Sequence, residues 1–591
     1  MNKDLVSLYT DRRDIFEREA RQIQQQEITT SWFRVGLMVG ILLMIYVSFQ
    51  VSMLWWLVLL MMIGYGYLVK RHEHLKHQLK LLQTLVMINE WEIKSQENDN
   101  TNFADGSEYI DSHHPYTFDL DIFGSGSLFQ RINRTSTETG KEKLANVLAN
   151  PLISKHSILS RQEAVEELKS RLDFRQKFQA VGLSSPEKKE DQGKILDWLQ
   201  LPSFIYGRKS FRWMLILFPT LSMGSLLLWI ISGFSAPFVV ITLVQWGIIG
   251  RYAKRVTLFQ NYIGNKRHLL GKFAEHFDLL NKEDLTGTIT KELREEAHEA
   301  GEELLILASR SRALDLRLNL LATLLFNSTI LYDLQCVYKL EQWRERNRAR
   351  LEKWLQAIAD TDALNSLATF AFNHPAYVTP EISEQQELSA SSLGHPLISD
   401  SDCVTNDVSL QKNSSLWIVT GANMAGKSTF LRTVGVNAVL ALTGSVVCAK
   451  KMICPLVEVF SGMRNTDSIN ENQSYFYAEL LRLHSIIERL REGKPMLVLL
   501  DEILKGTNSV DKLNGSQELL KQLTKLPCLA LIATHDVALS EMEKEFEQIR
   551  NFHFETRING DELLFDYKLY SGVSTGKNAT FLMRRMGIIP S

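Results

Sequence analysis

The chain has 591 residues, of which 45% are hydrophobic and 23% charged, and its formal net charge at pH 7 is −2. That length exceeds what one hydrophobic core supports and predicts about three or four domains. The near-neutral charge excludes a global basic field of the kind that marks many nucleic-acid binders. The five isolated cysteines are typical of buried thiols in a reducing compartment, and not of a disulfide framework or a zinc site.

The first part of the chain has the pattern of a membrane anchor. Residues 1–34 are charged and predict a cytoplasmic helix, and residues 35–69 then contain no charged residue. The uncharged run is too long for one ordinary span and has polar residues at its middle, so it predicts a hairpin of two short transmembrane helices. Basic residues flank both ends, which places both ends in the cytoplasm. A buried core hairpin is the alternative.

Residues 70–117 combine two patterns. Apolar residues recur at helical spacing from Leu75 to Trp91, which predicts an amphipathic helix that leaves the membrane. The stretch 97–114 is polar and acidic, with few large apolar side chains, and is interpreted as a linker. Residues 118–212 regain helical periodicity and predict the first part of a helical core domain.

A second uncharged run occupies residues 213–250 and is broken at its middle by the segment 232–237, which contains glycine and proline. Basic residues again flank both ends, so the same reasoning predicts a second hairpin with cytoplasmic ends. The total prediction is four transmembrane helices, in a multi-pass protein with both termini in the cytoplasm.

Residues 251–385 predict the second part of the helical core, which also serves as a lever. The uncharged stretch 318–332 is short for a membrane span, and a buried core helix is the preferred interpretation. Arginines crowd residues 344–350 beside Trp343. A solvated helix face is the favoured reading of this run, with contact to phosphate as the alternative.

Residues 386–591 contain the strongest motif, a phosphate-binding loop. Leu416 to Thr420 reads as a buried strand, and Phe430 to Leu442 as the helix that follows the loop. Glycines let successive N–H groups point at phosphate oxygens, and the helix N-terminus favours an anion. The predicted ATP-binding residues are Gly421, Ala422, Asn423, Met424, Ala425, Gly426, Lys427, Ser428 and Thr429.

Two later strands carry acidic and histidine side chains at their carboxyl ends. The apolar run 496–500 ends in Asp501 and Glu502, and the run 529–533 is followed by Thr534 and His535. Asp501, together with Ser428, is predicted to hold Mg²⁺, and Glu502 to activate the attacking water. His535 is the candidate for sensing the γ-phosphate. The order of these motifs predicts ATP hydrolysis.

These motifs resemble those of the MutS family of DNA mismatch repair ATPases. The loop 420–430, the segment 501–508 and the Ala533-Thr-His535 triplet are similar to that family's Walker A, Walker B and switch-histidine segments. The segment 474–479 resembles the family's Ser-x-Phe-x-x-Glu signature, and residues 572–590 its closing dimerisation segment. Residues 119–140, 161–168 and 377–382 resemble parts of its core domain.

The resemblance implies a C-terminal α/β P-loop ATPase domain of the ABC-like MutS type, on an α-helical core domain. It implies a homodimer in which the signature residues Ser474, Phe476 and Glu479 reach the nucleotide of the opposite subunit. Two membrane helices and a linker stand where repair members carry a mismatch-reading domain with a Phe-x-Glu motif. Phe273-Ala-Glu275 has that spacing, but it lies in a helical stretch and reads as incidental.

Three functions therefore compete. The first is an ATPase in the bacterial plasma membrane that engages DNA, and the second is a membrane-bound ATP switch that acts on a protein partner without DNA. The third, an ATP-driven transporter, is disfavoured. No Leu-Ser-Gly-Gly-Gln signature precedes Leu497, and the spans hold no charged residue that would mark a pathway.

Overall fold

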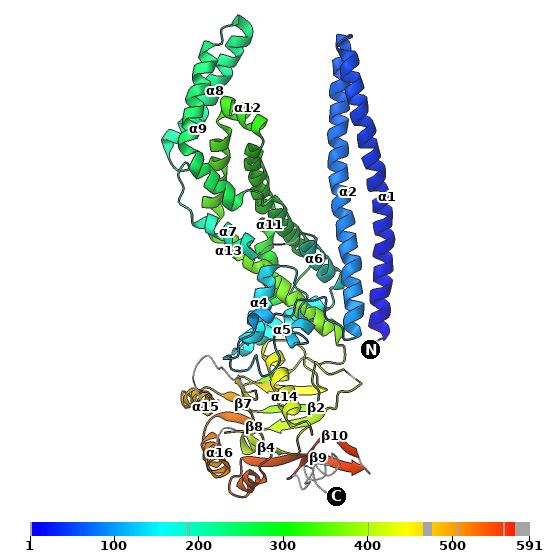
Figure 1. Ribbon diagram of the computed structural model, residues 1–591, viewed down its shortest axis with the longest axis vertical. Helices are drawn as coiled ribbons and strands as arrows, with labels where there is room; N and C mark the ends of the chain where they lie inside the picture. The colour runs from blue at the N-terminus through cyan, green and yellow to red at the C-terminus, as the bar shows by residue number, and fades with distance from the viewer. Residues whose placement is uncertain are drawn as a thin grey trace.

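The computed structural model describes residues 3–185, 187, 189–399, 401–464, 475–504, 508–559 and 562–573. Figure 1 shows an elongated molecule with two columns of helices at one end and an α/β domain at the other, joined by a helical body. Thus the described chain is helix-rich, with its strands confined to residues 381–571.

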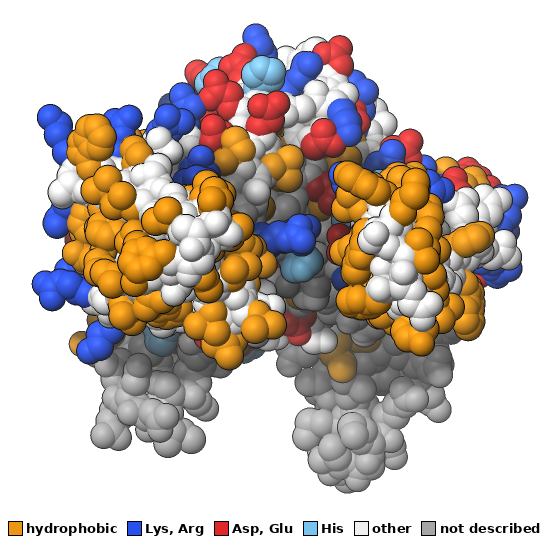
Figure 2. Space-filling model, turned by 90° about the horizontal axis from the view of Figure 1, so that it is seen from above, with side chains coloured by type: hydrophobic (Ala, Val, Ile, Leu, Met, Phe, Trp, Pro, Cys, Tyr) orange, Lys and Arg blue, Asp and Glu red, His pale blue; other side chains and the backbone are white. Residues whose placement is uncertain are grey.

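The first column is a hairpin of two long helices that lie side by side, and the second contains a further pair. These helices are α1 (Lys3–Ser48), α2 (Trp55–Gln96), α8 (Lys209–Ser232) and α9 (Ala236–Ile263). Among the described residues, these four helices are long and apolar enough to cross a membrane. Seen from above, hydrophobic side chains gather over the two separate columns (Figure 2).

The two helices of the first hairpin are longer than the short spans that the uncharged run predicted. Helix α1 continues from the charged N-terminal segment, and α2 continues through the amphipathic stretch to Gln96. The first proline in the chain is Pro115, so no proline interrupts either helix. Each apolar segment is therefore continuous with a polar stalk.

The helical body is built around one long helix that runs from the second column to the α/β domain (Figure 1). This helix is α13 (Tyr332–Asn373), 42 residues long. The other helices of the body are α3 (Leu128–Ile132), α4 (Glu138–Ala149), α5 (Lys155–Lys169), α6 (Leu172–Ser184), α7 (Lys189–Gln200), α10 (Arg267–Lys282) and α11 (Thr288–Asp315). Phe273 of α10 is fully buried, so this phenylalanine packs in the core of the helical body, as expected for an incidental Phe-x-Glu spacing.

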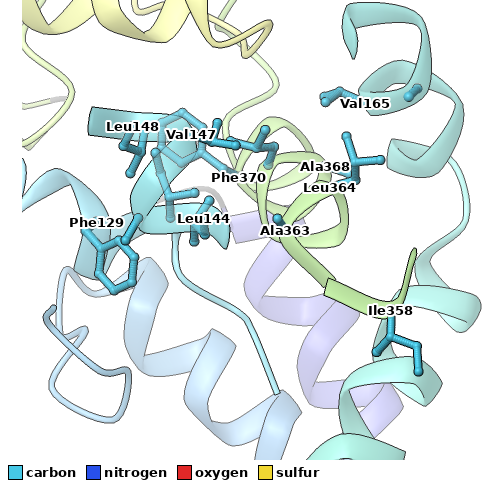
Figure 3. Packing of buried hydrophobic residues seen from close by; sticks show 14 of the residues in the cluster. Phe129, Leu144, Val147, Leu148, Val165, Ile358, Ala363, Leu364, Ala368 and Phe370 are labelled. Carbon is cyan, nitrogen blue, oxygen red and sulfur yellow. The ribbon is translucent and has the colours of Figure 1, made fainter. Parts of the chain in front are cut away.

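Apolar and polar contacts both fix α13 against the body. Figure 3 shows Phe370 of α13 packed beside Val147 and Leu148 of α4. The buried carboxylate of Asp362 accepts hydrogen bonds from the backbone N–H groups of Ser136 and Thr137, at 2.9 Å each. Burial nevertheless raises the pKa of Asp362 to about 6.

Three expectations are corrected by packing. The segment 97–114, expected to be a free linker, lies on the body: Phe103 is buried, and its ring centroid is 3.5 Å from the Arg134 guanidinium carbon. In the arginine run, Arg344 is buried and donates to the carbonyl of Trp198 at 3.0 Å, although Arg346, Arg348 and Arg350 are exposed as expected. Both differences arise from aromatic side chains far away in sequence, which pair with arginine.

The third correction concerns the stretch 318–332. It forms α12 (Leu320–Ile330), whose leucines are largely exposed, so the prediction of a buried core helix is wrong. Helix α12 packs on α8 and α9, the two helices of the second column (Figure 1).

The α/β domain holds two sheets. The smaller sheet has the order β1-β5-β2-β3, and the larger β10-β9-β4-β8-β7-β6, with all pairs of the larger sheet parallel except β10 with β9. The strands are β1 (Glu381–Ser383), β2 (Leu388–Leu393), β3 (Asn406–Leu410), β4 (Leu416–Thr420), β5 (Lys451–Pro455), β6 (Glu458–Gly462), β7 (Met496–Asp501), β8 (Cys528–Ala533), β9 (Ile549–Asn559) and β10 (Glu562–Ser571). The helices are α14 (Lys427–Leu442), α15 (Tyr475–Arg491) and α16 (Ser509–Leu523).

A buried carboxylate joins the body to the α/β domain. Asp119, which is fully buried, accepts hydrogen bonds from the Ser461 hydroxyl at 2.9 Å and from the Arg464 backbone N–H at 2.9 Å. Arg482 of α15 lies 3.0 Å from the same carboxylate. Next to it, Leu120 reaches α14, where a Cβ at Gly435 would lie 2.9 Å from its methyl carbons. The helix after the predicted phosphate loop therefore packs directly on the body.

A second buried polar cluster fastens the first hairpin to α13. The Glu92 carboxylate of α2 lies 2.5 Å from Nε of Arg134 and accepts from Asn373 Nδ2 at 2.8 Å. The hydroxyl of Tyr9 in α1 donates to Asn373 Oδ1 at 2.6 Å, and all four side chains are buried. The cluster thus joins α1, α2, the start of the body and the last residue of α13.

We expect Glu92→Gln to lower the free energy of unfolding by about 3 kcal/mol, because it leaves the buried Arg134 guanidinium without its counter-charge. Asp173→Asn is the matched control. Asp173 pairs with Arg12 between α1 and α6, but its side chain is 71% exposed, so its loss should cost under about 1 kcal/mol. Thermal unfolding of the two purified proteins in detergent measures both effects, and equal shifts would contradict the assigned role of the cluster.

Candidate nucleotide-binding site

The predicted phosphate-binding loop lies between the central strand β4 and helix α14. Every residue of β4 is buried, and β4 has parallel neighbours on both sides, which fixes where the loop begins. Three loop residues have positive φ: Gly421 at +149°, Met424 at +69° and Gly426 at +106°. A Cβ at Gly421 would lie 3.1 Å from the carbonyl oxygen of Phe554 in β9, so the backbone passes too close for a larger residue.

Lys427 and Ser428 begin α14 at the end of this loop. The Lys427 ammonium donates to the carbonyl oxygens of Gly421 and Ala422, at 2.8 and 2.9 Å. Burial lowers the pKa of Lys427, while Asp501 and Glu502 act in the opposite direction. The Ser428 hydroxyl donates to Asp501 Oδ2 at 2.5 Å. The loop lysine is thus folded over the loop, and the loop serine faces the acidic end of β7.

Glu502 and His535 follow the carboxyl ends of the adjacent strands β7 and β8. Nδ1 of His535 lies 2.9 Å from Oε1 of Glu502, within hydrogen-bond distance. Glu502 has φ +60°, and its backbone N–H donates to the carbonyl of Ala533 at 2.9 Å. A non-glycine residue with positive φ is often found at functional sites, and Glu502 is such a residue.

The loop and the acidic residues enclose a cavity of about 490 Å³. Of the loop residues, Gly421 and Ala425 do not line it, and Ala425 is buried beneath. The predicted residues that line the cavity are Ala422, Asn423, Met424, Gly426, Lys427, Ser428, Thr429, Asp501 and Glu502. The structure therefore brings the two acidic residues to the same space as the loop.

Sequence reasoning missed one wall of this cavity. It comes from the end of β2, from the segment between β2 and β3, and from β10, and its members include Leu393, His395, Val404 and Tyr567. Burial lowers the pKa of His395 to about 4, so its imidazole is neutral at physiological pH. The Tyr567 carbonyl accepts from Asn406 Nδ2 at 3.0 Å, which ties β10 to β3. No local motif marks these residues, because only contacts between segments far apart in the sequence bring them to the loop.

The predicted trans signature is described only in part. Ser474 and the side chain of Phe476 lie outside the described residues, as does the segment 574–590 of the predicted dimerisation region. Glu479 is described, and its Oε1 accepts from the backbone N–H of Leu504 in the same chain at 2.6 Å. Glu479 thus contacts the segment that follows Glu502.

Comparisons with known proteins agree with this architecture. Residues 116–368 match the family model of MutS domain III, and residues 417–590 match that of MutS domain V. Curated relatives include the DNA mismatch repair protein MutS of Persephonella marina, 31% identical over 40% of this chain and 28% of the relative. The protein of the same name from Clostridioides difficile is 31% identical over 38% of this chain and 24% of the relative.

The alignments leave most of each relative unmatched. A third relative, the DNA mismatch repair protein MutS of Staphylococcus haemolyticus, is 28% identical over 48% of this chain and 30% of its own length. The chain therefore spans about a quarter to a third of the curated relatives it matches. The two family models, by contrast, cover both the helical body and the α/β domain that carries the cavity, and on that ground the chain belongs to the MutS family.

Proposed function

We propose that this protein is a membrane-anchored ATPase of the MutS type that binds ATP with Mg²⁺, hydrolyses it as a homodimer and engages DNA. One observation carries the proposal: the loop of β4, the Ser428–Asp501 pair and the Glu502–His535 pair meet at the carboxyl edge of one parallel sheet. That edge is where α/β sheets bind their ligands.

The residues present fit a magnesium nucleotide. Backbone N–H groups at the N-terminus of α14 suit phosphate oxygens, and Lys427 exchanges its two carbonyl partners for the β- and γ-phosphates. Ser428 and Asp501 offer the hard oxygen ligands that Mg²⁺ prefers. Mg²⁺, when bound, offsets the charge of the β- and γ-phosphates. The apolar wall with Leu393 and Val404 suits the nucleotide base.

Glu502 and His535 supply the hydrolytic groups. Glu502 accepts a hydrogen bond from the attacking water and orients it toward the γ-phosphate. His535, already within hydrogen-bond distance of Glu502, contacts the γ-phosphate and reports its presence to β8. Ser474 of a second subunit completes the site in the dimer, with Phe476 and Glu479 positioning that loop.

The four apolar helices anchor this machinery in the bacterial plasma membrane, with the α/β domain in the cytoplasm. Their exposed apolar side chains and the basic residues at their bases support this orientation. DNA engagement is supported by the names of the relatives, and a protein partner in place of DNA is the alternative.

We expect Glu502→Gln to lower the rate of ATP hydrolysis by roughly 10²-fold or more while ATP binding is retained, since the amide cannot accept the proton. Phosphate release and binding of a fluorescent ATP analogue measure the two effects. Glu541→Gln is the matched control, because Glu541 lies in the same domain and, among the described residues, forms its ion pair with surface Lys544. Full hydrolysis by the Glu502 variant would contradict its role as the base.

Topology is tested by cysteine labelling in intact cells. We expect Ser52→Cys and Ala236→Cys, at the two hairpin turns, to react with a membrane-impermeant maleimide from outside. Glu295→Cys on α11 should react only after permeabilisation, because α11 belongs to the cytoplasmic body. The five native cysteines all lie between residues 336 and 528, on the proposed cytoplasmic side, so they add no background in intact cells, and labelling of the unsubstituted protein gives the background after permeabilisation. Labelling of Glu295→Cys in intact cells would contradict the orientation.

A further inference from the structure

Helix α12 presents an apolar face that no described residue covers. Leu320, Leu321, Leu324 and Leu325 have exposed fractions of 72, 77, 46 and 60%. Isolated exposed leucines are ordinary, but a continuous row on one short helix marks an interaction surface. Helix α12 packs on α8 and α9 (Figure 1), so its row of leucines lies next to the exposed apolar side chains of the second column.

Ser328 of α12 faces the other way, into that column. The Ser328 carbonyl accepts from the Ser222 hydroxyl of α8 at 3.1 Å and from the Thr242 hydroxyl of α9 at 3.4 Å. Trp246 Nε1 donates to the Ser328 hydroxyl at 3.0 Å. This division, with polar groups toward protein and apolar groups outward, is what a helix in lipid requires.

A side chain caps a backbone group at each end of α12. At the start, Asn319 Oδ1 accepts from the backbone N–H of Ala322 at 3.2 Å. At the end, the chain turns through Leu331, with φ +50°, and Gln335 Nε2 donates to the carbonyl of Ile330 at 2.8 Å. Non-helical backbone is tolerated at membrane depth only where protein satisfies it in this way.

An ion pair links the two residues that flank α12. Arg317, just before α12, lies 3.1 Å from the buried carboxylate of Asp333, just after it. Helices α12 and α13 meet there at a bend of 82°. Exposed Arg251, Lys254 and Arg255 lie on the cytoplasmic part of α9, where anionic lipid headgroups attract basic side chains.

We propose that α12 is the tip of a re-entrant segment, in which the chain enters the cytoplasmic leaflet at the end of α11 and leaves it through α13, with the leucine row of α12 in contact with lipid acyl chains. Its 11 residues extend about 16 Å. The 82° bend to α13 and the Arg317–Asp333 pair between its two flanks set this length along the leaflet and not through it. Helix α13 begins directly after it, so the long helix that ends at the α/β domain starts inside the membrane. This inference rests on the proposed membrane anchoring of α8 and α9.

The test places a photoreactive side chain in the full-length protein, reconstituted into vesicles of phosphatidylethanolamine and phosphatidylglycerol. Leu321→p-benzoylphenylalanine probes α12, the same substitution at Leu227 probes the exposed face of α8, and at Glu295 it probes the cytoplasmic body. After illumination, intact-mass spectrometry reports phospholipid adducts. An unchanged ATPase rate shows that each variant is folded, and Leu325 serves as a second position if the Leu321 variant is inactive.

We expect Leu321 to form lipid adducts as Leu227 does, at a yield about tenfold above Glu295, because only lipid-facing positions meet acyl chains. Adducts at Leu227 without adducts at Leu321 and Leu325 would overturn the re-entrant helix while leaving the membrane anchor intact. Absence of adducts at Leu227, Leu321 and Leu325 in active protein would instead contradict the membrane anchor itself.

Discussion

The buried cluster of Tyr9, Glu92, Arg134 and Asn373 is the constraint on which the arrangement of this protein depends. An ion pair taken out of water is stable only when each partner keeps its counter-charge and its hydrogen bonds, and here Asn373 and Tyr9 complete the set. Since Asn373 is the last residue of α13, the cluster fastens the first hairpin at the point where the body meets the α/β domain. The two columns are therefore held by one helix, at opposite ends.

Helix α13 therefore connects the two columns with the helical body. Its first turn follows α12 beside the second column, its Asp362 carboxylate holds the start of α4, and its end reaches the first hairpin. Asp119 and Leu120 then connect the body to β6 and to α14, the helix that begins with Lys427 and Ser428. In the proposed mechanism, a nucleotide that displaces Lys427 from its carbonyl partners acts on the same helix that packs on the body.

Much of the α/β domain could be predicted from sequence because buried parallel strands leave a strong local signal. The strand 416–420 is confirmed as β4, and the apolar runs at 496–500 and 529–533 are confirmed within β7 and β8. The wall with His395 and Tyr567 could not be predicted, since it joins segments more than 150 residues apart, which the hydrogen bond from Asn406 to the Tyr567 carbonyl links. The same reason explains Phe103, Arg344 and α12, whose environments are set by distant helices and not by local composition.

The measurement that tests the central proposal most directly is the ATPase rate of the detergent-purified protein with and without DNA, across a salt series. Perfect duplex, mismatched duplex and a four-way junction are the three substrates. The account predicts stimulation by DNA that weakens as salt rises, because phosphate contacts release counterions. A rate that is indifferent to all three substrates, with no salt-dependent DNA binding, would contradict DNA engagement and favour a membrane-bound switch with a protein partner.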